Sequence, residues 1–407
     1  MINILNINTI DGTKKNLQIA SAQDHTIHAE NLTLLPALTD PHVHFRIPGM
    51  DYKEDWRTAA RASIAGGVTT VFDMPNTLPP TTTVALLQEK KKIIDAQLKE
   101  AGIPLHYQLF FGADKDHLAE LSKIKHDAVG IKIFMGCSTG NLVVDSDETL
   151  SAIFEIAAAH DILVAVHAED EHILNANKAK YQGEKDYAVH SKIRDTHAAV
   201  AAVEKAISLT RRFGTRLYIL HMSTAEEVAL IQQAKQQNLP VYAETTPHHL
   251  FLNTHSYATL AGKAVMNPPL RSEKDQTALF AAIRDNIIDT IGSDHAPHTL
   301  SEKEKPYGQC PSGVPGIETL LPLLLNAHQQ GLLSLQNIVS LTSTRAREIF
   351  RLPANNDWVL VDLNKKMRVD EKKLKTKCAW SPYAGMELTG WPRYVVLGDK
   401  LFDLEKL

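Results

Sequence analysis

The chain has 407 residues, of which 44% are hydrophobic, and it carries a formal net charge of −4 at pH 7. This composition is sufficient for a large buried core, and it excludes the strongly basic surface of proteins that bind nucleic acids or anionic membranes. The three cysteines, Cys137, Cys310 and Cys378, lie far apart without paired metal-ligand spacing, which is typical of reduced thiols in the cytoplasm.

The N-terminal segment alternates apolar and polar residues, as a strand does, and lacks the basic start and long apolar run of a signal peptide. No segment approaches the roughly 20 apolar residues that span a bilayer. We therefore expect a soluble, cytoplasmic protein with neither a nucleic-acid nor a membrane partner, in which local cations would have to bind any small anionic substrate. The sequence leaves open whether the chain forms a homodimer.

Eight short apolar runs recur along the chain and are separated by amphipathic stretches. The predicted strands are Leu34–Leu38, Thr69–Met74, His106–Phe111, Gly130–Phe134, Ile162–Val166, Leu217–Leu220, Pro240–Glu244 and Asp289–Gly292. The predicted helices include Glu54–Ala65, Val84–Ala101, Leu150–Ala159, Ala198–Phe213, Ala225–Gln237 and Glu273–Asn286. This alternation indicates a parallel sheet covered by helices, and eight units favour a (β/α)8 TIM-type barrel. An open doubly wound sheet is disfavoured, because no glycine-rich phosphate loop follows the first strand.

The two ends of the chain do not follow this alternation. Residues 1–32 and the tail from Trp358 onward contain short strand patterns instead. We therefore predict a small β domain formed by residues 1–32 and 353–407, beside a barrel domain formed by residues 33–352.

Residues that can bind a metal ion follow four of the predicted strands. His42 and His44 follow the first strand, and His167, His221 and Asp294 follow the fifth, sixth and eighth. Residues i and i+2 of a strand share a face, so the first two histidines project together. Each histidine alone would more often be a hydrogen-bonded residue of a core or loop. Because active-site groups of such barrels lie at the carboxyl ends of the strands, the five together predict a metal site.

Lys132 lies inside the apolar strand Gly130–Phe134. A buried ammonium group is costly unless it is paired, so one interpretation is a structural ion pair with an acid. Alternatively, the amine adds carbon dioxide and becomes a carbamate, which bridges two metal ions as a carboxylate does. The histidines on neighbouring strands favour the bridge.

Several segments match the motifs of a known family of enzymes. They are Asp40–Arg46, Gly66–Thr77, Asn267–Arg271 and Ser293–His298, together with the tail segment Ser381–Met386. In this combination they make the chain resemble the dihydroorotases, which are cyclic-amide hydrolases of the amidohydrolase superfamily. Ile47 departs from the pattern, since many relatives have glutamate there.

The resemblance implies two zinc ions. His42, His44 and Asp294 would hold the first ion, His167 and His221 would hold the second, and a carboxylated Lys132 would bridge both.

The resemblance also implies how the substrate binds. Arg46, Asn76 and His298 would contact its carboxylate, while Asn267 and the backbone around Gly313–Gly316, including Gly313 and Pro315, would contact its ring. Ser138 and Thr139 would belong to a loop that closes over the substrate. The adjacent His248 and His249 are expected to be structural, because Pro247 interrupts their strand.

The implied activity is the reversible interconversion of dihydroorotate and N-carbamoyl-aspartate in pyrimidine biosynthesis. A hydroxide held by the two metal ions would attack the ring amide, with Asp294 taking its proton as a base and returning it as an acid. The planar guanidinium of Arg46 suits a carboxylate, which hydantoin and allantoin lack.

Three alternatives stay open. The first is an allantoinase or hydantoinase with the same binuclear site. The second is a mononuclear deaminase that would need His42, His44, His221 and Asp294 but not Lys132. The third is a non-catalytic scaffold subunit of a transcarbamoylase complex, against which the retention of all six ligands argues.

Overall fold

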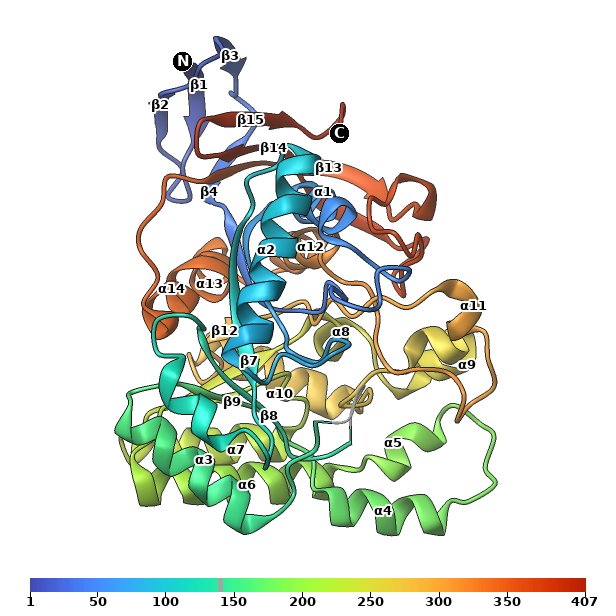
Figure 1. The fold of residues 1–407 in the computed structure, drawn as a ribbon. Coiled ribbons are helices and arrows are strands. Elements are labelled where there is room, and N and C mark those ends of the chain that lie inside the picture. Colours follow the sequence, from blue (N-terminus) through green and yellow to red (C-terminus); the bar gives the residue numbers. More distant parts are fainter. Residues whose placement is uncertain (138–141) are drawn as a thin grey trace.

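The protein, described by a computed structural model over residues 1–137 and 142–407, contains a sheet of eight parallel strands in chain order (Figure 1). These strands are β5 (Leu38–Val43), β6 (Val68–Asp73), β7 (His106–Gly112), β8 (Gly130–Phe134), β9 (Val164–His167), β10 (Leu217–Ile219), β11 (Val241–Thr245) and β12 (Thr290–Ile291). Val43 forms a parallel bridge with His295, just beyond β12, which brings the two edges of the sheet together. The predicted (β/α)8 barrel is confirmed.

Helices connect successive strands and pack around the barrel. The main ones are α1 (Trp56–Ala65), α2 (Val84–Ala101), α3 (Asp147–Ala159), α6 (Thr196–Phe213), α7 (Ala225–Gln236), α10 (Glu273–Arg284) and α12 (Leu320–Gln329). Shorter helices are α4 (Glu171–Lys180), α5 (Val189–Ile193), α8 (Pro247–Phe251), α9 (Tyr257–Leu260), α11 (Leu300–Lys303), α13 (Leu335–Val339) and α14 (Arg345–Phe350). Helix α2 has the predicted bounds, because Thr83 caps its first turn and Gly102, with a φ of 69°, ends it. Among the described residues, no helix has both the length and the apolar character needed to cross a membrane.

The two ends of the chain form a second, seven-stranded sheet, seen at the top of Figure 1. It contains β1 (Ile2–Asn8), β2 (Lys14–Ile19), β3 (His25–His28), β4 (Thr33–Pro36), β13 (Trp358–Arg368), β14 (Glu387–Leu397) and β15 (Lys400–Asp403). Strand β13 pairs antiparallel with β4 and so joins the C-terminal strands to the N-terminal ones. The small β layer predicted from both termini is therefore present, while the domain boundaries at residues 32 and 353 stay a prediction.

The apolar run predicted as the first barrel strand is divided between the two sheets. Its first part belongs to β4, which pairs with β13, whereas the barrel strand β5 begins at Leu38. Pro36 has no backbone N–H to continue the ladder, and the N–H of Ala37 donates to the carbonyl of Asp357 at 3.0 Å. As a result, His42 lies within the first barrel strand, and His44 lies directly after it.

Candidate metal centre and active site

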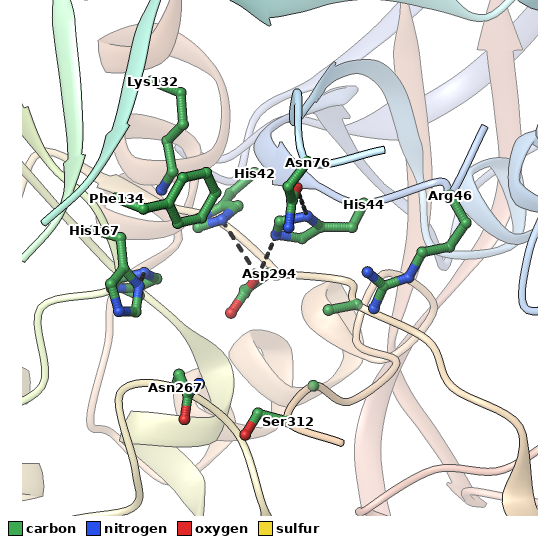
Figure 2. Close-up of a pocket in the computed structure, with 13 residues that line it drawn as sticks. His42, His44, Arg46, Asn76, Lys132, Phe134, His167, Asn267, Asp294 and Ser312 are labelled. Atoms are coloured by element: carbon green, nitrogen blue, oxygen red, sulfur yellow. Dashed lines mark hydrogen bonds and ion pairs between the residues drawn. The ribbon is translucent and has the colours of Figure 1, made fainter. Parts of the chain in front are cut away.

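A cavity at the carboxyl ends of the barrel strands brings most of the predicted site residues together (Figure 2). Its lining comprises His42, His44, Arg46, Asn76, Lys132, Phe134, His167, His221, Asn267, Asp294, Ala296, Ser312 and Gly313. All six predicted metal ligands are in this set. They come from five strands that are distant in sequence, and the curvature of the barrel directs their side chains into one space.

His42, His44 and Asp294 form the tighter of two ligand groups. Oδ1 of Asp294 lies 3.3 Å from Nε2 of His42 and 3.1 Å from Nε2 of His44, and one ligand atom from each residue lies within 4.8 Å of the others. Burial alone would raise the pKa of the Asp294 carboxyl, but the two histidines lower it well below its usual value. Burial also lowers the pKa of His44 to about 3, so its imidazole is neutral, as a metal ligand must be.

His167 and His221 form the second ligand group. Nδ1 of His167 faces Nε2 of His221 at 2.8 Å, and burial lowers the pKa of both imidazoles. Nε2 of His167 lies 2.8 Å from the buried carboxylate of Glu169, which Arg194 neutralises through a 3.0 Å hydrogen bond from Nε. Because Glu169 engages Nε2, Nδ1 of His167 is the ring nitrogen that would bind an ion shared with His221.

Lys132 extends from β8 into the cavity, with its ammonium nitrogen 4.5 Å from the ring centre of Phe134. Burial lowers its pKa to about 7. Among the residues that the structure describes, its Nζ has no hydrogen bond and no carboxylate within 4.0 Å, so the structural ion pair is absent there. At pH 7 a substantial fraction of this amine is therefore neutral, and the neutral amine is the form that can add carbon dioxide.

Arg46 lies deeper, with 2% of its surface exposed, and adopts a left-handed backbone with a φ of 68°. Its Nε donates to the carbonyl of Pro297 at 3.0 Å, and its Nη2 lies 3.2 Å from Nε2 of His298. Burial lowers the pKa of the guanidinium to about 10, so it stays charged at neutral pH. Within the described part of the chain, no hydrogen bond engages its Nη1, which leaves that arm for an anion in the cavity.

Of the other predicted substrate contacts, three line the cavity and His298 lies outside its lining. Asn76 lines the cavity, but its Oδ1 also accepts a 2.8 Å hydrogen bond from Nδ1 of His44. Asn267 and Gly313 line the cavity as well, and Oδ1 of Asn267 lies 3.0 Å from Nε2 of His190. His298 is fully buried beside Arg46 and is not part of the cavity lining.

Pro315 is not in the cavity lining either, since it borders a neighbouring pocket with His295 and Gly316. Ser138 and Thr139, predicted to close over the substrate, lie outside the described residues.

Sequence reasoning missed three buried partners of the ligands, which are Glu169, Arg194 and Glu244. Glu244 lies at the carboxyl end of a predicted strand, so the rule that found Asp294 could have found it. Glu169 lies two residues beyond His167 and could have been found in the same way. The expected structural role of His249 agrees with its contacts, because its ring nitrogens lie 2.9 Å from Oγ1 of Thr246 and 3.1 Å from the carbonyl of Pro268.

Known proteins share both this sequence pattern and this fold. Residues 33–356 match the model of the amidohydrolase family. The dihydroorotase of Methanosarcina acetivorans is 36% identical over 401 residues, which cover 95% of this chain and 85% of that protein. The dihydroorotase of Halobacterium salinarum is 36% identical over 361 residues, which cover 86% of this chain and 82% of that protein.

Among solved structures, the L-hydantoinase (dihydropyrimidinase) from Arthrobacter aurescens is similar, with a TM-score of 0.91 and 28% identity, covering 98% of this chain and 95% of that one. The identity to the dihydroorotases is higher than the identity to this hydantoinase. The chain belongs to the amidohydrolase family and, within it, to the dihydroorotases.

Proposed function

We propose that this protein is a metal-dependent dihydroorotase that interconverts dihydroorotate and N-carbamoyl-aspartate. The observation that carries the proposal is that one cavity contains all six predicted metal ligands together with the buried cation Arg46. A metal centre alone would suit many cyclic amides, whereas a buried guanidinium arm beside it favours a substrate that carries a carboxylate.

The donor set fits two zinc ions. His42, His44 and Asp294 would hold one, His167 and His221 the other, and a carboxylated Lys132 would bridge them. Imidazoles and carboxylates are suitable zinc ligands, and the site supplies four imidazoles and one carboxylate. When bound, such ions lower the pKa of a water molecule and polarise the scissile carbonyl. Lys132 supports the bridge, because it is buried without an acidic partner among the described residues.

The residues of the chain then have distinct tasks in the reaction. Arg46 binds the substrate carboxylate, with Asn76 beside it and His298 supporting the guanidinium from behind. Asn267 and the Gly313–Gly316 backbone contact the ring. This arrangement directs the amide carbonyl toward the ligand groups.

Asp294 is the proton carrier. Its carboxylate is ionised and faces the cavity, so Oδ takes a proton from the attacking water and delivers it to the departing ureido nitrogen. Ring closure uses the same groups in the reverse order: Asp294 takes a proton from the ureido nitrogen, which attacks the side-chain carboxyl of N-carbamoyl-aspartate. Asp294 then returns that proton to the carboxyl hydroxyl as the C–O bond breaks, and this oxygen leaves as water.

The experiment is a direct comparison of substrates with metal counting. Purified protein is assayed with dihydroorotate, allantoin and hydantoin, and its zinc content is measured per chain. We expect turnover of dihydroorotate alone and two zinc ions per chain. Turnover of hydantoin or allantoin in its place would support the alternative enzymes, one ion would support the deaminase, and no turnover at full metal content would support the scaffold subunit.

The location and assembly of the protein stay predictions. We propose a cytoplasmic enzyme with a small-molecule substrate, and size-exclusion chromatography with light scattering would show whether it is a homodimer.

A further inference from the structure

Glu244 is a carboxylate sealed inside the barrel, behind the proposed metal centre. It lies in β11 with no exposed surface and is absent from the cavity lining. Its Oε1 lies 2.8 Å from Nδ1 of His42 and accepts the backbone N–H of His221 at 3.2 Å. Its Oε2 accepts the hydroxyl of Tyr218 at 2.9 Å. One oxygen atom therefore contacts a ligand of each proposed ion.

This contact selects the ligand atom of His42. A carboxylate only accepts hydrogen bonds, so the proton of the imidazole lies on Nδ1 and the lone pair lies on Nε2. Nε2 is the atom that faces Asp294, at 3.3 Å. On the other side, His221 has a left-handed backbone with a φ of 40°, and Glu244 holds its N–H in that conformation.

The barrel is built to accommodate this carboxylate. At Gly292, which directly follows β12, a Cβ atom would lie 2.6 Å from Oε2 of Glu244 and 2.8 Å from Cβ of His42. Any larger residue there would displace the carboxylate, the imidazole or both. Thr290 completes the arrangement, since its Oγ1 lies 2.6 Å from the Tyr218 hydroxyl. Residues in or directly after three other strands, β5, β10 and β12, thus surround this one side chain of β11.

The charge of Glu244 is not balanced by a side chain in direct contact. Within the described residues, no lysine or arginine nitrogen lies within 4.0 Å of it, and its partners are a phenol, an imidazole and a backbone amide. A buried anion of this kind needs nearby positive charge. Two divalent ions carry four positive charges, and Asp294, Glu244 and a carboxylated Lys132 would supply three negative ones.

We infer that Glu244 is a positioning residue for both metal ions: it orients His42, anchors His221 and contributes the buried negative charge that favours divalent cations. The inference rests on the proposed binuclear centre. Removing a hydrogen-bond partner of this kind behind a metal ligand costs about 10–100-fold in metal affinity.

Two variants separate charge from geometry. Glu244→Gln keeps an oxygen for His42 and His221 and an amide for the Tyr218 hydroxyl, but loses the charge. Gly292→Ala keeps the charge but inserts a methyl group against the carboxylate. Asp357→Asn is the matched control, because it changes a buried carboxylate that lies 3.1 Å from His106 at the opposite end of the barrel.

Zinc affinity and stoichiometry are measured by competition with a chelator of known affinity, and folding of the metal-free proteins by circular dichroism. We expect both site variants to fold and to bind zinc at least about 10-fold more weakly, with wild-type affinity in Asp357→Asn. Added zinc should restore much of the turnover of Glu244→Gln.

Wild-type zinc affinity in both site variants would overturn the role of Glu244, as would an equal loss in the control. Should Glu244→Gln not fold, Gly292→Ala decides the question alone. Failure of the wild-type protein to bind two zinc ions would instead reject the proposed metal centre, and this inference with it.

Discussion

Buried hydrogen-bond partners determine which atom of each histidine faces the cavity. Asn76 engages Nδ1 of His44 and leaves Nε2 for an ion, whereas Glu169 engages Nε2 of His167 and leaves Nδ1. Each of these candidate metal ligands therefore has a partner residue that orients its imidazole ring. Mutating the orienting partner should weaken metal binding without removing a ligand.

The first residue-scale prediction concerns Arg46. Arg46→Met removes a charged donor whose hydrogen bonds to a carboxylate are worth about 1.5–3 kcal/mol each, so kcat/KM for dihydroorotate should fall about 100-fold or more. Zinc content should be unchanged, since the guanidinium is not a ligand. Arg216→Met, at the amino-terminal end of β10, is the control and should retain activity. Unaltered affinity for dihydroorotate in Arg46→Met would contradict the assigned role.

The second residue-scale prediction concerns carboxylation of Lys132. Only the neutral amine reacts with carbon dioxide, and burial lowers the pKa of Lys132 to about 7. At constant dissolved carbon dioxide, reactivation of the metal-free enzyme by zinc should therefore become faster as pH rises toward 7 and level off above it.

Stopped assays at a series of pH values would measure this reactivation, with Lys132→Ala as the inactive control. Full reactivation in the absence of carbon dioxide would rule out the carbamate.

At the scale of elements, backbone strain is concentrated where strands end at the site. Arg46, His221 and Asp294 all have positive φ values, of 68°, 40° and 45°, and each closely follows a barrel strand. Non-glycine residues in such conformations cost roughly 1–3 kcal/mol each. The turns they form direct their side chains toward the cavity. Packing in the rest of the barrel must therefore offset the conformational cost of these turns.

The element-scale prediction tests the loop that contains Gly313. This glycine has a φ of 135°, and a Cβ atom there would lie 2.6 Å from the carbonyl oxygen of Ala296 and 3.1 Å from Nε2 of His298. Gly313→Ala should therefore displace the loop and lower kcat/KM for dihydroorotate by about 10-fold or more, without changing zinc content.

Gly308→Ala is the matched control, since it also has a positive φ but no neighbour within 4 Å of its Cβ. Equal losses of activity in the two variants would show that backbone strain alone, and not contact with the site, is responsible.

At the scale of the whole molecule, the C-terminal tail is attached to the catalytic end of the barrel. Trp380 is fully buried, and its Nε1 donates to the carbonyl of His298 at 2.7 Å. The backbone N–H of Lys377 donates to the buried carboxylate of Glu54, which precedes α1. Because His298 contacts Arg46, the terminal segment reaches the proposed substrate carboxylate site through a single intervening residue.

The corresponding prediction is that Trp380→Phe weakens substrate binding from a distance. Loss of the hydrogen bond should lower the free energy of unfolding by about 1 kcal/mol and raise KM for dihydroorotate, while zinc content is unchanged. Trp391→Phe is the control, because its Nε1 donates within its own strand to Leu388. Denaturant titration would measure the change in stability, and steady-state kinetics the change in KM. An unchanged KM in Trp380→Phe would show that the C-terminal segment does not affect substrate binding through Arg46.

The sequence by itself determined the architecture and the candidate ligands. Apolar strands that alternate with amphipathic helices specify a barrel through local periodicity, and the rule that active sites lie at the strand ends selected His42, His44, His167, His221 and Asp294.

Only the tertiary structure decided the supporting contacts. Glu244 meets His42 across 202 residues of sequence, the run at Leu34–Leu38 divides between two sheets, and His298 lies behind Arg46 instead of in the cavity lining. Such pairings depend on how distant segments pack. Local periodicity does not encode them, because each residue is compatible with its own strand or turn whether or not its distant partner is present.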